Sequence, residues 1–355
     1  MGLIDTGHIA EHHDALLSDT AKTSGGGPLR FFAALLLGSA LMIGTGVTLK
    51  DRLLPLATSL LSQATAFLPG HRVIDVSDKS LLATPTLAGP LTLTALSPAE
   101  LMEKYPPAIG QSLPDGTFEQ PAWQRLRRPV ASLSQPYLAV LVSGLGLNKA
   151  LTAAAILYLP PAVSLSFSPY APDLAAWIDA ARAHGHEALV DLPLESAAPQ
   201  DDPGGDGLMT GLRPQENSSR LNRIIDRAPH ALGVTTALGS RFLTDQSALQ
   251  PVLAVLAAHG LAIVEASPDP RMLTDQVAAT LKLQHVKAAL AIDEAEGRDE
   301  ILRGLSLLTA DAPHGTHPLV VVAPSPLSLA LIAGWCKQLA DQGLALTPAS
   351  NMLAQ

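Results

Sequence analysis

From Tyr137 onward, short apolar runs alternate with longer segments rich in alanine and leucine. The apolar runs have the length of buried strands, and the segments between them have the length of helices. Such alternation is typical of parallel strands that are joined by crossover helices. The predicted strands are Leu138–Val142, Val163–Phe167, Ala188–Leu192, Leu232–Thr235, Ala262–Glu265, Ala288–Ile292, Leu319–Ala323 and Ala345–Leu346.

Helical segments connect these strands. About eight strand–helix units favour a parallel (β/α) barrel slightly over an open α/β sheet. In both architectures the functional site lies at the carboxyl ends of the strands. The predicted helices include Leu174–His184, Pro214–Ala228, Ala248–His259, Met272–Lys282, Glu300–Leu308 and Leu327–Gln342.

Near the N-terminus, Phe31–Leu49 is a run of 19 residues without charge. A helix of this length spans the hydrocarbon core of a bilayer, about 30 Å thick. We expect an uncleaved single-pass anchor, because a signal peptide has a shorter apolar region and a core helix has polar positions. Lys22 and Arg30 precede the run, and Lys50 and Arg52 follow it, so nearby charge does not choose an orientation.

Between the anchor and the domain, prolines recur from Pro69 to Pro136. Proline fixes φ and removes a hydrogen-bond donor, so we expect an extended tether with one short helix near Pro98–Tyr105. Leu53–Leu68 is either an interfacial helix or an extension of the anchor. The predicted parts are a polar tail (1–30), the anchor (31–49), a juxtamembrane segment and linker (50–135), and a folded domain (136–350).

The amino-acid composition argues against several classes of protein. Hydrophobic residues make up 47% of the 355 residues, which argues against a disordered chain. The formal net charge of -9 disfavours a nucleic-acid partner. The single cysteine, Cys336, excludes an intrachain disulfide, and we expect it in a helix core.

The glycine turn after the first predicted strand, in "YLAVLVSGLGLNKA", lies where α/β proteins bind phosphates. Gly144 and Gly146 fit the first two positions of a dinucleotide fingerprint, but Lys149 occupies the third. No acid follows about 20 residues later, so the fingerprint fails. A Gly-x-Ser-x-Gly elbow is also missing, and no two histidines of the folded domain have the i, i+4 spacing of a helical zinc site.

Six motifs in order resemble the divergent polysaccharide deacetylase family, relatives of the NodB-type carbohydrate esterases. The resemblance covers Pro136 to Ser350 and implies a distorted parallel (β/α) barrel. Family members hydrolyse an acetyl group from a sugar with a divalent metal, a carboxylate base and a histidine acid. The motifs here are "VLVSGLGLN", "LSFSPYAPDL", "GHEALVDLPLES", "LMTGL", "TTALGSRFLTD" and "VAPSPLSL".

The resemblance also places the family's catalytic positions. Its paired aspartates fall on Ser143 and Gly144, and its three histidines fall on Asp191, Ala237 and Ala323. Alanine neither binds a metal nor moves a proton, and glycine offers no base. The resemblance therefore implies a site that has lost its metal and its acid–base pair, and no cofactor is expected.

Polar residues at other strand ends remain as candidates. They support either of two functions: a non-catalytic envelope protein that binds a glycan or a protein, or an unusual deacetylase whose carboxylates hold a hard cation such as Mg²⁺ or Ca²⁺. A structural scaffold for a membrane complex is a third, weaker option. We expect an inner-membrane anchor with the domain in the periplasm. The cleft candidates are Asp191, Glu195, Ser240, Arg241, Glu265 and Asp293.

Overall fold

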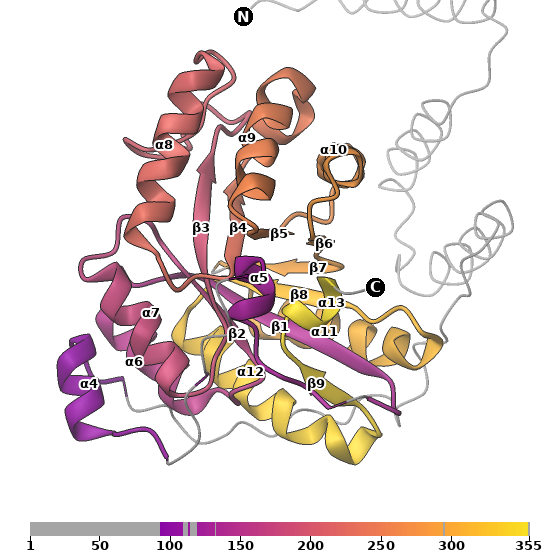
Figure 1. Ribbon diagram of the computed structural model, residues 1–355. Coiled ribbons are helices and arrows are strands. Elements are labelled where there is room, and N and C mark those ends of the chain that lie inside the picture. The colour runs from indigo at the N-terminus through magenta and orange to yellow at the C-terminus, as the bar shows by residue number, and fades with distance from the viewer. Residues whose placement is uncertain (1–92, 109–112, 114–118, 132, 294, 354–355) are drawn as a thin grey trace, which may run out of the picture. The chain divides into compact units, whose positions relative to one another are not determined.

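The computed structural model (Figure 1) describes residues 93–108, 113, 119–131, 133–293 and 295–353. The predicted tail, the anchor Phe31–Leu49 and the segment Leu53–Leu68 lie outside the described residues. Among the described residues, no helix is both long and apolar enough to cross a membrane.

One sheet of nine strands forms the centre of the domain. The strand order is β6-β5-β4-β3-β2-β1-β8-β7, and β9 pairs with β1. All pairings between these described strands are parallel. The strands are β1 (Tyr137–Leu145), β2 (Ser164–Phe167), β3 (Ala188–Leu194), β4 (Gly233–Leu238), β5 (Ala262–Glu265), β6 (His285–Lys287), β7 (Leu290–Ile292), β8 (Leu319–Val322) and β9 (Ala345–Thr347).

The parallel α/β class is confirmed, but the predicted barrel is not closed. Within the described part of the chain, β6 and β7 end the sheet without pairing with each other. The sheet is therefore a curled half-barrel. The strand β6 was not predicted, because its sequence His285–Lys287 has one apolar residue and no apolar run.

Helices follow most strands, as the alternation predicted (Figure 1). Their bounds differ from the predicted ones by one to a few residues, because helix ends depend on local capping. The longer helices of the domain are α6 (Lys149–Tyr158), α7 (Leu174–Ala183), α8 (Pro214–Arg227), α9 (Gln246–Ala258), α10 (Thr274–Leu281), α11 (Arg298–Asp311) and α12 (Pro326–Gln338).

Alternate residues of β1 enter two different hydrophobic clusters. Leu138, Val140 and Val142 belong to the larger cluster, which also contains most of the buried helix residues. Ala139 and Leu141 belong to the smaller cluster, together with buried residues of other strands. Successive side chains of a strand point to opposite faces, so the sheet is buried on both sides.

The described part of the predicted linker packs on the domain. The predicted short helix is confirmed as α4 (Pro98–Lys104), which begins with a capping box between Ser97 and Glu100. A second helix, α5 (Ala122–Arg125), was not predicted. Leu101 and Leu126 are completely buried, so apolar side chains between the prolines hold this part against the domain rather than leaving it an extended tether.

Candidate functional site

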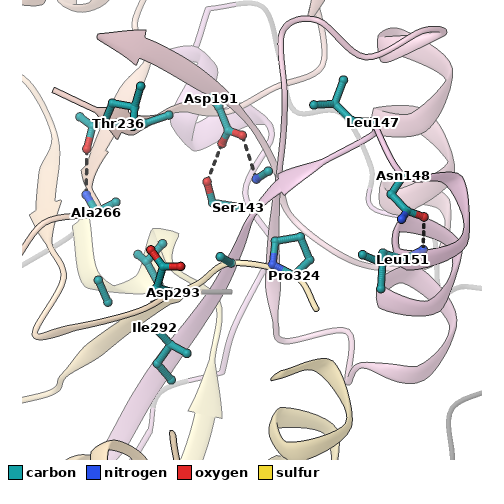
Figure 2. A pocket seen from close by; sticks show the side chains of 16 residues that line it. Ser143, Leu147, Asn148, Leu151, Asp191, Thr236, Ala266, Ile292, Asp293 and Pro324 are labelled. Atoms are coloured by element: carbon teal, nitrogen blue, oxygen red, sulfur yellow. Dashed lines mark hydrogen bonds between the residues drawn. The ribbon is translucent and has the colours of Figure 1, made fainter. Parts of the chain in front are cut away.

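A cavity of about 580 Å³ lies towards the carboxyl ends of β1, β4, β7 and β8 and beside Asp191 in the middle of β3 (Figure 2). This volume is in the range of small-ligand sites. The position agrees with the rule that sites of parallel sheets form at the carboxyl ends of the strands. Six residues singled out in the sequence line it: Ser143, Gly144, Asp191, Ala237, Asp293 and Ala323.

The carboxylate of Asp191, on β3, is the best-held polar group of this cavity. Its Oδ1 accepts hydrogen bonds from Ser143 Oγ (2.9 Å) and from Ser166 Oγ (2.5 Å). Its Oδ2 accepts one from the backbone N–H of Gly144 (2.8 Å). Asp191 is only 4% exposed, and burial raises its pKa although the three hydrogen bonds oppose the shift.

The carboxylate of this cavity lies on a different strand from the one that the resemblance implies. The resemblance implies two aspartates on β1 and a histidine on β3, whereas here β3 carries the aspartate. Ser143 and Gly144 on β1 supply donors to it (Figure 2). Gly144 has a φ of +88°, a conformation that a residue with a side chain adopts only with strain.

The other two positions on which the resemblance places histidines also line the cavity. Ala237 is the next-to-last residue of β4, and Ala323 follows β8. Neither side chain carries a donor, an acceptor or a metal ligand. The neighbouring hydroxyl of Thr236 accepts a hydrogen bond from the Ala266 N–H (2.9 Å), which joins the ends of β4 and β5 (Figure 2).

Asp293 is the second carboxylate of the cavity. It follows β7, is exposed, and accepts a hydrogen bond from the Ala295 N–H (3.0 Å). Its own backbone N–H donates to Glu296 Oε1 (3.0 Å). The loop therefore holds Asp293 in place while its side chain stays open to solvent.

Three other candidates lie together, but they do not line the cavity. Glu195 Oε2 accepts hydrogen bonds from the N–H and the Oγ of Thr210 (2.6 and 2.7 Å), and Glu195 Oε1 lies 3.4 Å from Arg241 Nε. Burial would raise the pKa of Glu195, but Thr210 and Arg241 outweigh it, so the pKa is lowered. Ser240 Oγ accepts from the Ala197 N–H (2.9 Å). These contacts order two loops beside the site.

The fourth candidate carboxylate, Glu265, is 1% exposed and lies 3.0 Å from Lys287 Nζ. Burial raises its pKa, and Lys287 opposes this shift. This ion pair joins the ends of β5 and β6, away from the residues that line the cavity.

The side chains at the cavity do not fit the metal that the family implies. Among the described residues, Asp191 and Asp293 are the only carboxylates that line it, and no histidine does. Among the residues the structure describes, no group of three or more His, Cys, Asp or Glu side chains is arranged to hold a metal ion. A hard cation such as Mg²⁺ or Ca²⁺ needs more oxygen ligands than these two side chains offer.

Two exposed leucines of the cavity were not predicted. Leu147 is 59% exposed and Leu238 is 49% exposed, and both line the opening. Leu238 also has a φ of +61°, which is rare for a residue other than glycine or asparagine. Nothing in the alternation of apolar positions distinguishes an exposed leucine at a strand end from a buried one.

Three comparisons relate the chain to known proteins. The model of the divergent polysaccharide deacetylase family matches residues 140–353. The uncharacterized protein YibQ of Escherichia coli (strain K12) is 23% identical over 150 residues, which are 41% of this chain and 46% of YibQ, so the match spans about half of that relative. A crystal structure of the uncharacterized protein ATU2773 from Agrobacterium tumefaciens C58 is similar with a TM-score of 0.63 and 30% identity, over 68% of this chain and 99% of that one.

Proposed function

The chain belongs to the divergent polysaccharide deacetylase family, as its motifs predicted, and from that premise we propose that its domain binds a ligand without hydrolysing it. One observation supports this proposal above all others. The cavity at the strand ends presents Ser143, Gly144, Ala237 and Ala323 where the resemblance implies catalytic side chains. A glycan or a protein of the cell envelope is the proposed partner.

The proposal includes a place in the cell. The uncharged run Phe31–Leu49 supports a single-pass anchor in the inner membrane, with the domain in the periplasm. Alkaline phosphatase fused after Gln355 is expected to be active, since this reporter folds only outside the cytoplasm. Activity of a cytoplasmic reporter at the same position, with an inactive phosphatase fusion, would contradict the proposed orientation.

The purified full-length protein is expected to release no acetate above the buffer control from acetylated chitin oligosaccharides or acetylated xylan. The reason is that proton transfer to the leaving group and stabilisation of the oxyanion both need side chains that alanine and glycine lack. Acetate is measured with Zn²⁺, Mg²⁺, Ca²⁺ or Mn²⁺ added in turn. Metal-dependent release that a chelator abolishes would overturn the proposal.

A double variant, Ser143→Asp with Gly144→Asp, tests whether the loss is reversible. We expect it to release no acetate either, because the methyl groups of Ala237 and Ala323 still neither bind a metal nor transfer a proton. The change at Gly144 also costs about 1–3 kcal/mol of stability, because aspartate must adopt a φ of +88° there. Recovery of acetate release in this variant would show that the emptied positions on β4 and β8 do not limit the chemistry.

The alternative function, an active deacetylase with a carboxylate metal site, needs Asp191, Glu195, Glu265 and Asp293 to act together. Glu195 and Glu265 do not line the cavity and have basic partners of their own. No observation on the described residues therefore favours this alternative.

A further inference from the structure

Among the described residues that line the cavity, two carry carboxyl groups and none is basic. These two residues are Asp191 and Asp293. Each carboxylate is held by hydrogen bonds from uncharged donors only: hydroxyl and backbone N–H groups around Asp191, and a backbone N–H beside Asp293. A buried carboxylate without a cation is costly, so the cavity favours a positively charged ligand group.

The walls of the same cavity are aliphatic. Leu151, Ile292, Val321 and Pro324 line it, and no aromatic side chain in the described part of the chain does. A sugar ring would lose water from several hydroxyl groups against such walls and would regain few hydrogen bonds. An aliphatic side-chain stem has no polar groups, so it loses no hydrogen bonds to water when it packs against these walls.

At the opening, Leu147 and Leu238 present apolar side chains to solvent. Exposed apolar groups around a polar centre are typical of surfaces that bind another molecule. Leu238 gains little burial in return for its strained φ of +61°, so its position is explained better by contact with a partner than by folding.

We propose that this cavity binds a lysine side chain of a protein partner. The ammonium group lies at Asp191 and Asp293, the aliphatic stem lies along the walls, and apolar neighbours of the lysine cover Leu147 and Leu238. This inference rests on the proposed binding function and names its ligand.

The hydrogen bonds of Asp191 favour lysine over arginine. Asp191 Oδ1 already accepts two hydrogen bonds, and Oδ2 accepts one. Since a carboxylate oxygen has two lone pairs, one position remains, on Oδ2. A guanidinium needs two parallel acceptors for its bidentate contact, whereas an ammonium is a point donor that needs one.

Peptide binding to the full-length protein in detergent tests the proposal by calorimetry. The probe is the acetylated, amidated pentapeptide Ala-Leu-Lys-Leu-Ala, compared with peptides that carry norleucine or arginine in place of the lysine. We expect the lysine peptide to bind at least about 10-fold more tightly than the norleucine peptide, because a charge-assisted hydrogen bond is lost. Equal affinities of these two peptides would overturn the proposal.

Two variants and a control variant test whether the peptide binds in this cavity. Asp191→Asn is expected to remove most of the preference for lysine over norleucine, and Leu238→Gly is expected to weaken both peptides alike. The control Asp341→Asn changes an exposed carboxylate that does not line the cavity and is expected to leave both affinities unchanged. A lysine preference that persists in Asp191→Asn would show that the peptide binds elsewhere.

The stability of Leu238→Gly separates binding from folding. Glycine relieves strain of about 1–2 kcal/mol at a positive φ. It loses about 1 kcal/mol from the buried half of the leucine and about 0.5–1 kcal/mol of chain entropy. Unfolding is therefore expected at nearly the same urea concentration as in the natural chain. A large loss of stability would show that Leu238 serves the fold and would contradict its assigned role.

A glucosamine trimer and an N-acetylglucosamine trimer are the last probes. We expect neither to bind as tightly as the lysine peptide. Tight binding of a trimer in place of the peptide, without acetate release, would overturn the lysine proposal and leave the binding function standing. Acetate release would remove the binding function itself, so the two failures are distinguishable.

Discussion

Replacing Glu187 with leucine is expected to lower the free energy of unfolding by about 4 kcal/mol. Glu187 precedes β3 and is 1% exposed. Its carboxylate accepts hydrogen bonds from the Arg128 N–H (2.7 Å), Ser164 Oγ (3.2 Å), the Ser350 N–H (3.1 Å) and Ser350 Oγ. One buried side chain thus joins β2 to the segment before the domain and to the C-terminal helix α13 (Ser350–Leu353).

The magnitude follows from the donors that leucine leaves behind. The N–H groups of Arg128 and Ser350 would be buried without an acceptor, and each such group costs about 1–3 kcal/mol. Burial raises the pKa of Glu187, and the hydrogen bonds from Ser350, Arg128 and Ser164 oppose the shift. The donors therefore stabilise the buried carboxylate, and the carboxylate in turn satisfies their hydrogen bonds.

Urea unfolding followed by tryptophan fluorescence measures the loss, since Trp177 is 1% exposed and Trp123 is 8% exposed. Glu187→Gln keeps one acceptor oxygen and is expected to fall between the natural chain and the leucine variant. The control is Glu103→Leu on the exposed face of α4, with an expected change within about 0.5 kcal/mol. If Glu187→Leu unfolds at the same urea concentration as the control variant, the hydrogen bonds around Glu187 do not hold these segments together.

The pattern of apolar residues along the chain predicted the parallel α/β class. It did not predict whether the sheet closes into a barrel. Strand Ala262–Glu265 was predicted with the bounds it has, because an apolar run of this length between turn residues is typical of a buried parallel strand. The short edge strand β6 has intermediate burial and no apolar run. Whether β6 reaches β7 depends on contacts between edge strands, and periodicity along the chain carries no information about those contacts.

Part of the site was predicted by the rule that functional residues of parallel sheets lie at the carboxyl ends of the strands. That rule brought Ser143, Asp191 and Asp293 to one cavity. It failed for Glu265, because the ion pair of Glu265 is with Lys287 on the strand that was not predicted. The partners of Glu187 lie up to 163 residues away in the sequence, so its role was not visible from any local motif.

Strand β1, which carries Ser143 and Gly144, leads into a turn at Gly146, where Gly146→Ala is expected to cost about 3–4 kcal/mol of unfolding free energy. Gly146 has a φ of +97°, and a Cβ added there would lie 2.4 Å from Ala171 Cβ. The backbone strain contributes about 1–3 kcal/mol, and the forced contact contributes a similar amount. The Gly146 N–H also donates to Thr152 Oγ (2.8 Å), so a shift of the turn would lose this buried hydrogen bond.

A double-mutant cycle with Ala171→Gly separates the two costs of Gly146→Ala. Ala171→Gly removes the contacting Cβ but leaves the φ of the turn unchanged, so the double variant is expected to be about 1–2 kcal/mol more stable than the sum of the single changes. Gly211→Ala is the matched control, because nothing lies within 4 Å of a Cβ built there. Its expected change is within about 0.5 kcal/mol. Strict additivity in the cycle would assign the whole cost to the backbone, and a Gly146→Ala variant as stable as Gly211→Ala would show that the turn beside the cavity does not require glycine.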